Sequence, residues 1–351
     1  MSGAPDPLRG VLRELAAGRP VQPAEVTLAF DVVMRGEASA VQIAALLMGL
    51  RVQGESAAVI AAVARALRGA MVRLPSAEPD ALVDTCGTGG GAISTFNIST
   101  AAALVAAGAG ARIAKHGNRS FTSRSGSADV LEALGVRADP SVAAMQRALA
   151  TAGIAFMYAP AMHPAMRHVG AVRRELAVPT VMNVVGPLAN PAMAGRQVVG
   201  VADAHRAPLI AGALADLGAV HALVVHGEPG LDEISPLGPT RVYEIVADAD
   251  GPRATTTREW TISPRALGLV AHDAAELAGG APEENARVVL DVLGGGGREG
   301  ARAAVLLNAG AAVYVAGLEP TYEAAVERAR AALDRGLGLR ALELLRAAYA
   351  E

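Results

Sequence analysis

From residue 82 onward, short apolar runs alternate with segments of helical periodicity, and this alternation limits the possible folds more than any other feature of the chain. Strands separated by helices favour a largely parallel sheet, because each parallel return requires a crossover connection. The predicted strands are 82–84, 112–114, 154–157, 198–201 and 223–225, and the predicted helices between them are about 98–110, 127–135, 141–152 and 205–217. We therefore expect an α/β domain with a mostly parallel central sheet.

The two ends of the chain carry different patterns. The first 74 residues contain no strand signal, and Pro23, the capping box Ser39–Gln42 and Ser56 mark the starts of short helices. The C-terminal third predicts strands near Tyr243 and Ile262 and two alanine-rich helices, at about 300–316 and 320–348. We expect a small all-helical domain over 1–74, joined by helices from about 164–190, and an α/β domain over 80–351.

Composition excludes several classes of protein. A net charge of −3 and 3% aromatic residues do not fit a nucleic-acid-binding surface. No stretch reaches the roughly 18 apolar residues of a membrane span, and the N-terminus lacks the apolar core of a signal peptide. The single cysteine, Cys86, cannot form a disulfide within the chain. These features predict a cytoplasmic protein that binds neither nucleic acid nor membranes.

The segment DTCGTGGGAISTFNIST, residues 84–100, joins the first predicted strand to the first helix of the α/β domain. Its glycines leave backbone N–H groups open to an anion, and the helix start adds donors and a favourable dipole. Strand, glycine loop and helix start together predict a phosphate-binding site. The alternative, a glycine-rich turn before a well-capped helix, remains open on this segment alone.

The same glycines also satisfy the dinucleotide-binding pattern GxGxxG/A between Gly87 and Ala92. That fold also requires an acidic residue about twenty positions further on, to hold the ribose hydroxyls. Here the next strand instead ends in Lys115 and His116, and no Gly-Lys-Ser/Thr follows the glycines. We therefore reject the nucleotide-fold interpretations.

The second informative segment is KHGNRSFTSRSGSADVLEALG, residues 115–135. Lys115, His116, Arg119 and Arg124 concentrate positive charge within ten residues, Gly117 and Asn118 favour a turn there, and Ser127 can cap the following helix. Charges interleaved with serines and glycines suit a compact anionic ligand such as a diphosphate. A solvated basic loop is the alternative.

The motifs GTGG, NIST, KHGNRS, SGSADVLEALG, NVVGPLANP and GLDEIS follow one another in this order. This ordered set, from about residue 8 to the last helices, closely resembles the anthranilate phosphoribosyltransferases. The resemblance implies transfer of a phosphoribosyl group from phosphoribosyl pyrophosphate (PRPP) to the amino group of anthranilate, a step of tryptophan biosynthesis. It also implies a homodimer formed through the helical part and a magnesium-dependent active site at the hinge. The PRPP-binding residues it implies are Gly87, Gly90, Gly91, Thr95, Asn97, Ile98, Ser99, Thr100, Lys115, His116, Gly117, Asn118, Arg119, Ser120, Ser123 and Ser127.

The adjacent carboxylates Asp232 and Glu233 follow the last predicted parallel strand, on a loop rich in glycine and proline. Alone, such a pair more often lies solvated on a loop. The resemblance makes both carboxylates ligands of Mg²⁺, together with the Ser99 hydroxyl, with two ions per monomer when PRPP is bound. One position departs from the family: Gly91 stands where its members usually carry Asp, which predicts a weaker second metal site and less inhibition by excess Mg²⁺.

The acceptor side is indicated by residues 158–191, where helical spacing brings Met166, Gly170 and Arg173 to one face. An arginine can hold a benzoate through two hydrogen bonds, although in isolation Arg173 more often belongs to a solvated helix face. The resemblance makes Arg173 the anchor of the anthranilate carboxylate. Gly87, Asn118, His116 and His163 would line the path of the ring, whereas we interpret His168 as structural or exposed.

The implied reaction needs no covalent nucleophile. Displacement at the anomeric carbon, with oxocarbenium character, would rest on positioning and on electrostatic stabilisation of the leaving group, with Lys115 in that role. A pyrimidine nucleoside phosphorylase-like enzyme and a catalytically dead nucleic-acid-binding relative are the alternatives. The pair Asp232–Glu233 and the basic segment after residue 115 argue against the phosphorylase. A nucleic-acid binder would have a basic face and lost carboxylates, and this sequence has neither.

Overall fold

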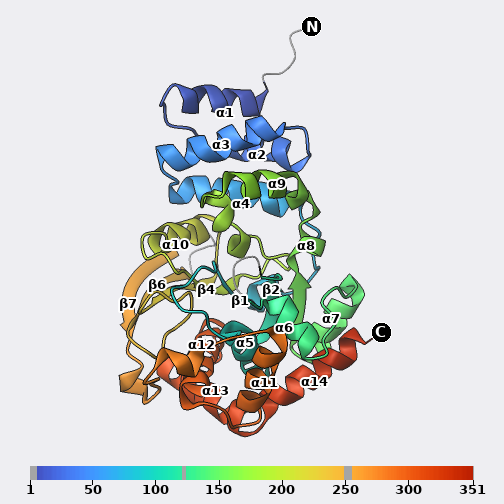
Figure 1. The fold of residues 1–351 in the computed structure, drawn as a ribbon, viewed down its shortest axis with the longest axis vertical. Helices are drawn as coiled ribbons and strands as arrows, with labels where there is room; N and C mark the ends of the chain where they lie inside the picture. Colours follow the sequence, from blue (N-terminus) through green and yellow to red (C-terminus); the bar gives the residue numbers. More distant parts are fainter. Residues whose placement is uncertain (1–5, 121–123, 249–254, 351) are drawn as a thin grey trace.

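The computed structural model describes residues 6–120, 124–248 and 255–350. A stack of helices forms one end of the molecule, and a sheet covered by helices on both faces forms the other (Figure 1). The N-terminal helices are α1 (Pro7–Ala16), α2 (Pro23–Met34), α3 (Ala40–Gln53) and α4 (Ala57–Ala70). Helix α9 (Arg167–Leu176), far away in sequence, packs against α3 and α2 (Figure 1).

Local signals placed the N-terminal helices correctly. Pro23 is the first residue of α2, and Ser39 and Gln42 form the predicted capping box at the start of α3. The Ser56 hydroxyl accepts the Val59 N–H, 3.3 Å away, at the start of α4. Such caps satisfy N–H groups that the helix itself leaves unpaired, which is why a short sequence pattern is sufficient to locate them.

The sheet has seven strands in the order β3-β2-β1-β4-β5-β6-β7, and the strands from β3 to β5 are parallel. Strands β6 and β7 extend it in antiparallel fashion. The strands are β1 (Leu82–Gly87), β2 (Arg112–Gly117), β3 (Ile154–Tyr158), β4 (Arg196–Gly200), β5 (His221–Gly227), β6 (Thr240–Ala247) and β7 (Thr255–Ile262). The predicted α/β domain with a mostly parallel sheet is therefore confirmed.

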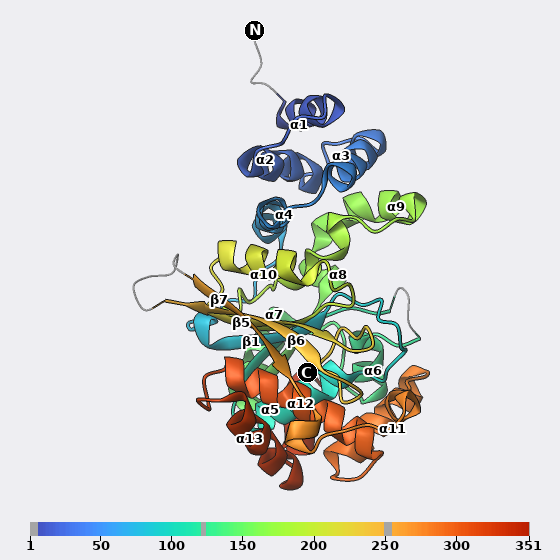
Figure 2. The same ribbon diagram turned by 90° about the vertical axis from the view of Figure 1, so that its left-hand side faces the viewer.

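Helices cover the two faces of the sheet unequally. Helix α10 lies on the side of the N-terminal stack, whereas α5, α12 and α13 lie on the opposite side (Figure 2). The remaining α-helices are α5 (Ile98–Gly108), α6 (Ser127–Ala133), α7 (Val142–Thr151), α8 (Ala159–Met162), α10 (Ala207–Asp216), α11 (Pro282–Leu293), α12 (Glu299–Val315), α13 (Tyr322–Asp334) and α14 (Leu337–Tyr349). Short 3-10 turns occur at Pro79–Ala81, Pro164–Met166, Val181–Asn183, Gly186–Leu188, Arg265–Leu267 and Ala274–Leu277. Among the described residues, every helix is too short or too polar to cross a bilayer.

Two local predictions were wrong, and one helix was missed. The single helix expected over 320–348 is two helices, because Gly336 takes a left-handed conformation at φ +66° between α13 and α14. Gly126, rather than Ser127, is the N-cap of α6, and Ser127 is the first helical residue. Helix α11 was not predicted at all.

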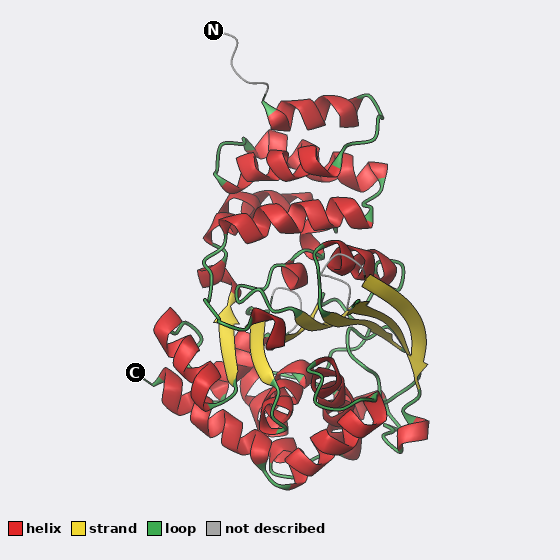
Figure 3. Ribbon diagram, turned by 180° about the vertical axis from the view of Figure 1, so that it is seen from behind, coloured by secondary structure: helices red, strands yellow, loops and turns green. Residues whose placement is uncertain are grey.

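The C-terminal helices lie together beneath the sheet when the molecule is seen from behind (Figure 3).

Two hydrophobic cores meet at the sheet. Side chains alternate between its faces, so that Val198 joins the core with α5 and α12, whereas Val199 joins the core with α10. The second core continues through α10 and α4 into α2 and α3. Helix α10 thus lies between the helical stack and one face of the sheet (Figure 2). The crossovers diverge between the neighbouring strands β1 and β4, and such sheets bind ligands at the carboxyl ends of the strands at this point.

Candidate active site

The loop after β1 carries the glycine cluster predicted to bind phosphate. Gly89 and Gly90 adopt left-handed conformations, with φ +71° and +80°, and Gly87, Gly89 and Gly90 are exposed. A Cβ atom at Gly87 would overlap the carboxylate of Asp232, which approaches from the loop after β5. Glycine is therefore needed at position 87 for the two loops to meet.

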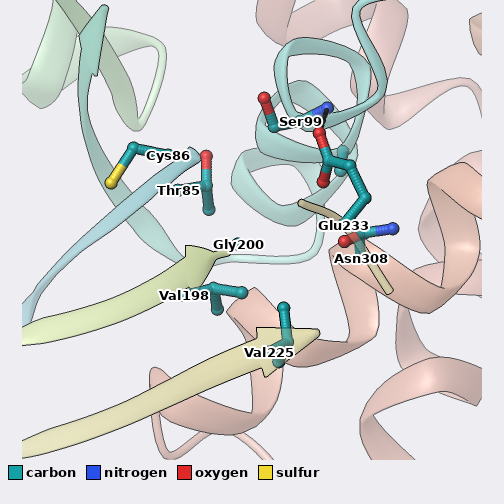
Figure 4. Close-up of a pocket in the computed structure, with 9 residues that line it drawn as sticks. Thr85, Cys86, Ser99, Val198, Gly200, Val225, Glu233 and Asn308 are labelled. Atoms are coloured by element: carbon teal, nitrogen blue, oxygen red, sulfur yellow. Dashed lines mark hydrogen bonds between the residues drawn. The ribbon is translucent and has the colours of Figure 1, made fainter. Parts of the chain in front are cut away.

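The two adjacent carboxylates lie against the glycine loop and the start of α5. Asp232 Oδ2 accepts the Gly89 N–H at 2.8 Å, and Glu233 Oε1 accepts the Ser99 N–H at 3.2 Å. Burial raises the pKa of Asp232; burial and the neighbouring Asp232 raise the pKa of Glu233 to about 8. Figure 4 shows Glu233 directed toward Ser99. Glu233, which is 134 positions downstream of Ser99, and the adjacent Asp232 are thus part of the same site as the glycine loop.

These groups also define what cation the site could hold. Among the described residues, no cluster of three or more His, Cys, Asp or Glu side chains has the arrangement of a complete metal site. Asp232, Glu233 and the Ser99 hydroxyl supply only hard oxygen donors. Such a partial set suits Mg²⁺, which commonly completes its coordination with water and substrate phosphate oxygens.

Lys115 connects the first two strands to the helix start. It is 2% exposed, and its ammonium group donates to the Thr85 carbonyl, to Thr85 Oγ1 at 3.3 Å and to Ser99 Oγ at 3.2 Å. Burial lowers the pKa of Lys115, and the nearby Asp84 opposes that shift. The structure therefore brings Lys115, from the segment 115–135, next to the Ser99 hydroxyl, near the end of the segment 84–100.

Asp84 is a buried residue next to the site that sequence reasoning missed. Its buried carboxylate accepts the His116 N–H at 3.0 Å and Asn190 Nδ2–H at 2.7 Å, and Asn190 also donates to the Ala114 carbonyl at 2.8 Å. Burial raises the pKa of Asp84, and the hydrogen bond from Asn190 opposes the rise. These bonds join the NVVGPLANP segment to β1 and β2, just before Lys115. The NVVGPLANP motif indicated that Asn190 belongs to a family-specific segment, but nothing in the motif identified Asp84 as the partner of Asn190.

The second predicted loop folds back on α6. The Asn118 carbonyl accepts the Ala128 N–H at 3.1 Å and the Ser127 hydroxyl at 3.3 Å. Arg119 pairs with Asp129 at 3.0 Å and with Glu132 at 2.7 Å, so two carboxylates of α6 already neutralise its charge. The Ser120 N–H donates to Asp129 at 3.0 Å. Ser123, another predicted PRPP ligand, lies outside the described residues.

The other predicted PRPP ligands have less open positions. Thr95 forms a backbone bridge with Ala278, and the side chains of Ile98 and Thr100 are buried. Gly117 lies against Ser127, and Gly91 lies beside Gly230 and Asp232. Ile98 can offer a ligand only its backbone, and its N–H already donates to the Phe96 carbonyl at 2.7 Å.

The predicted acceptor residues include a pair of neighbouring histidines. The rings of His116 and His163 are 4.9 Å apart between centroids, and both are buried. Burial lowers the pKa of His116 to about 3 and that of His163 to about 4, so both rings are neutral at physiological pH. His116 Nε2 and both nitrogens of His163 have no partner with hydrogen-bond geometry among the described residues, although the Ala189 backbone opposes part of the fall in the His163 pKa.

Arg173 belongs to α9, on the side of the helical stack, and is half-buried. Burial lowers its pKa, and within the described part of the chain no carboxylate pairs with it. A half-buried guanidinium without an acidic partner is suited to an external carboxylate. His168, in the same helix, packs on Gly36, in keeping with a structural role.

A small cavity separates the helix start from the sheet (Figure 4). It is lined by Thr85, Cys86, Ser99, Ala102, Val198, Gly200, Val225, Glu233 and Asn308 and has room for about one water molecule. The Cys86 sulfur is directed away from Glu233 (Figure 4), and burial raises the pKa of the thiol well above its usual value. Cys86 is therefore unsuited to be a nucleophile.

Asn308, on α12, is another residue of the site that the sequence did not indicate. Its side-chain Oδ1 accepts the Ile234 N–H at 2.9 Å, and its Nδ2 donates to the carbonyls of Ile234 at 3.0 Å and Ala304 at 2.9 Å. The Asn308 amide thus forms hydrogen bonds with both the N–H and the carbonyl of Ile234, the residue that follows Glu233. No local pattern predicts this contact, because the partners are 74 positions apart.

Comparisons with known proteins agree on one family. Residues 9–71 match the glycosyl transferase family helical bundle domain, and residues 79–339 match the glycosyl transferase family a/b domain. The chain is 50% identical over 336 residues to the anthranilate phosphoribosyltransferase of Rubrobacter xylanophilus, which covers 96% of both chains. The crystal structure of anthranilate phosphoribosyltransferase from Thermus thermophilus matches with a TM-score of 0.89 and 40% identity, over 97% of this chain and 99% of that one. The enzyme from Saccharomyces cerevisiae in complex with PRPP and Mg matches with a TM-score of 0.85 and 27% identity, over 99% of each chain.

Proposed function

Since the chain belongs to the anthranilate phosphoribosyltransferase family, we infer that it transfers the phosphoribosyl group of PRPP to the amino nitrogen of anthranilate. The products are N-(5-phosphoribosyl)anthranilate and pyrophosphate, and the reaction belongs to tryptophan biosynthesis. The observation that carries this function is the convergence of Asp232, Glu233 and Lys115 on the exposed glycine loop and on Ser99 at the start of α5.

The donor would bind along the first two loops. The N–H groups of Gly90 and Gly91 form no hydrogen bond with another described residue and suit pyrophosphate oxygens. Lys115 is close enough to the start of α5 to stabilise charge that develops on the leaving group. The loop at Asn118–Ser127 would hold the phosphoribosyl end. For Arg119 this requires exchange of its carboxylate partners on α6 for a phosphate, so we regard it as the weakest of the proposed ligands.

Magnesium fits the acidic end of the site. A yeast relative has been solved with PRPP and Mg, and Asp232, Glu233 and Ser99 offer the oxygen donors that such an ion needs. When bound, Mg²⁺ would neutralise the pyrophosphate leaving group. The proposal includes two ions per monomer with PRPP, of which the one nearer Gly91 binds more weakly because that position lacks a carboxylate.

Anthranilate would approach from the side of α9. Arg173 would bind its carboxylate, and the neutral rings of His116 and His163 would contact the aromatic ring, with Gly87 and Asn118 at the far end of the path. No side chain needs to form a covalent bond with the sugar. The chain orients the amine opposite the departing pyrophosphate, which converts an encounter of two substrates into a reaction within one complex.

The helical stack would act as the second wall of the site and as a dimer surface. We place the boundary between a helical domain, 1–74 with helices from about 164–190, and an α/β domain, 80–351, with a hinge between them. Leu28, Val41 and Val52 on α2 and α3 are 52%, 79% and 81% exposed, which favours a homodimer formed through this stack in the cytoplasm. Light scattering coupled to gel filtration would test the dimer, and a monomer at all concentrations would contradict it.

One assay tests the proposed function directly. Anthranilate is fluorescent, so its consumption is followed after addition of PRPP and Mg²⁺, with reactions lacking either compound as controls. We expect loss of fluorescence only in the complete mixture. An unchanged signal, together with phosphorolysis of thymidine in the presence of inorganic phosphate, would instead identify a pyrimidine nucleoside phosphorylase.

A further inference from the structure

Helix α5 begins at Asn97, but the Asn97 side chain does not cap it. Asparagine at this position ordinarily accepts an N–H of the first turn. Here its Oδ1 accepts Asn285 Nδ2–H at 2.9 Å and the Ser125 hydroxyl at 3.2 Å instead, and no N–H of α5 donates to it. Two competing donors therefore hold the side chain away from its own helix.

The N–H group that a capping Asn97 would accept is consequently available for the site. A capping residue takes the N–H of the second or third helical residue, which are Ser99 and Thr100. The Ser99 N–H donates to Glu233 Oε1 at 3.2 Å, and this bond fixes a carboxylate beside the glycine loop. If Asn97 rotated back to the cap, it would compete with Glu233 for the same N–H.

The buried amide of Asn285, on α11, is held between two partners, Gly280 and Asn97. Asn285 is 2% exposed, its Oδ1 accepts the Gly280 N–H at 2.7 Å, and its Nδ2 points to Asn97. The hydrogen-bond chain continues from Asn97 to Ser125, because Asn97 Nδ2 donates to the Ser125 carbonyl at 3.2 Å. One chain of amide hydrogen bonds thus joins α11 to the start of α5 and to the loop that precedes α6.

We propose that Asn285 is a positioning residue of the PRPP site. It keeps Asn97 from capping α5, so that the Ser99 N–H remains open to Glu233, and through Asn97 it holds Ser125 beside the start of α5. Asn285 touches no substrate itself; it acts through Asn97 and Ser125. This inference rests on the proposed function and adds to it a residue far from the glycine loop in sequence.

Two substitutions separate positioning from simple support of the fold. Asn285→Ala removes both hydrogen bonds, whereas Asn285→Asp keeps the acceptor for the Gly280 N–H but cannot donate to Asn97. Val289→Ala, at a fully buried position of the same helix, is the matched control, because it weakens the packing of α11 without touching the amide chain. The KM values of both substrates, kcat and the melting temperature are measured for each purified full-length variant, and PRPP binding is measured by calorimetry.

We expect both Asn285 variants to raise the KM and the calorimetric Kd of PRPP by roughly tenfold, with the KM of anthranilate within about twofold of wild type, as loss of a connected hydrogen bond predicts. Val289→Ala should lower the melting temperature and leave the KM of PRPP unchanged. Rescue of PRPP binding by Asn285→Asp, or an effect on melting alone, would overturn the proposal. If wild-type protein binds PRPP but does not consume anthranilate, the proposed acceptor is wrong, and the calorimetric comparison still decides the role of Asn285.

Discussion

The two sides of the candidate site are built differently. On the donor side, Lys115, Asp232 and Glu233 are each held by hydrogen bonds to the glycine loop, β1 or α5. On the acceptor side, nitrogens of His116 and His163 lack hydrogen bonds within the described chain, and Arg173 has no carboxylate there. Buried polar atoms usually find partners, so unpaired ones deserve an explanation.

This difference indicates that the donor side of the site is formed before its ligand binds. Donor-side charges are already oriented by protein dipoles, so little reorganisation is needed when pyrophosphate departs. Acceptor-side groups gain hydrogen bonds or a counterion only when a molecule enters. We therefore expect donor-side substitutions to reduce turnover, and acceptor-side substitutions to change anthranilate affinity or the pH dependence of stability.

The largest expected effect is on the donor side. Lys115→Ala should lower kcat on the order of 10²–10³-fold, because it removes a preorganised charge next to the leaving group. Steady-state kinetics at saturating PRPP and anthranilate measure this change, and a circular dichroism spectrum like that of wild type is the control for folding. A loss of less than about fivefold would show that the ammonium group is not important for the reaction.

The acceptor side should control stability at acidic pH. The pKa of His163 falls from 6.5 to about 4 on folding, so between these values the unfolded chain binds a proton that the folded protein excludes. Stability contributed by the neutral ring is complete above pH 6.5 and is lost as the pH falls, by on the order of 3 kcal/mol at pH 4.

His163→Phe tests this assignment, because it fills the position without a titratable group. Denaturant unfolding of ligand-free protein at pH 4 to 8 should show a smaller acid-side loss in the variant than in wild type. His116 remains in both proteins and contributes in the same direction. Identical pH profiles would mean that His163 is not held neutral in the folded state.

Arg173→Ala should change the KM of anthranilate much more than the KM of PRPP. The KM of anthranilate should rise by about 10- to 150-fold, as loss of a charge-assisted contact of roughly 1.5–3 kcal/mol predicts, whereas the KM of PRPP should stay within about twofold. Arg173→Lys should restore little, because a lysine lacks the planar fork that binds a carboxylate through two bonds. A change in the KM of PRPP alone would assign Arg173 to the donor.

The smallest expected effect concerns Gly91. An ideal Cβ atom there would lie 3.4 Å from Asp232 Oδ1 and 3.3 Å from the Gly230 carbonyl, so an aspartate would bring a third carboxylate to the acidic pair. Gly91→Asp should introduce inhibition of a few-fold at millimolar Mg²⁺, where wild type keeps its activity, as added ligand charge strengthens cation binding. Strong inhibition of wild type by the same Mg²⁺ concentrations would contradict the weak second site.

Local chemistry made much of the molecule predictable. The helix starts at Pro23, Ser39 and Ser56 follow from capping patterns a few residues long, and the five parallel strands follow from apolar runs between helical segments. The break at Gly336 was missed because alanine-rich periodicity continues across it, and a single left-handed glycine ends α13 without any change in composition.

The fold class could be predicted from the alternation of apolar and helical segments. The two loops that we predict to bind an anion, and the acidic pair, could also be found in the sequence, because each lies within one short segment at the end of a strand. Only the tertiary structure decided how these segments are held. Asn285 reaches Asn97 across 188 positions, Asn190 reaches Asp84 across 106, and Asn308 reaches Ile234 across 74. One buried amide paired with one distant group produces no periodicity and no local motif, so its partner becomes known only when packing brings the two together.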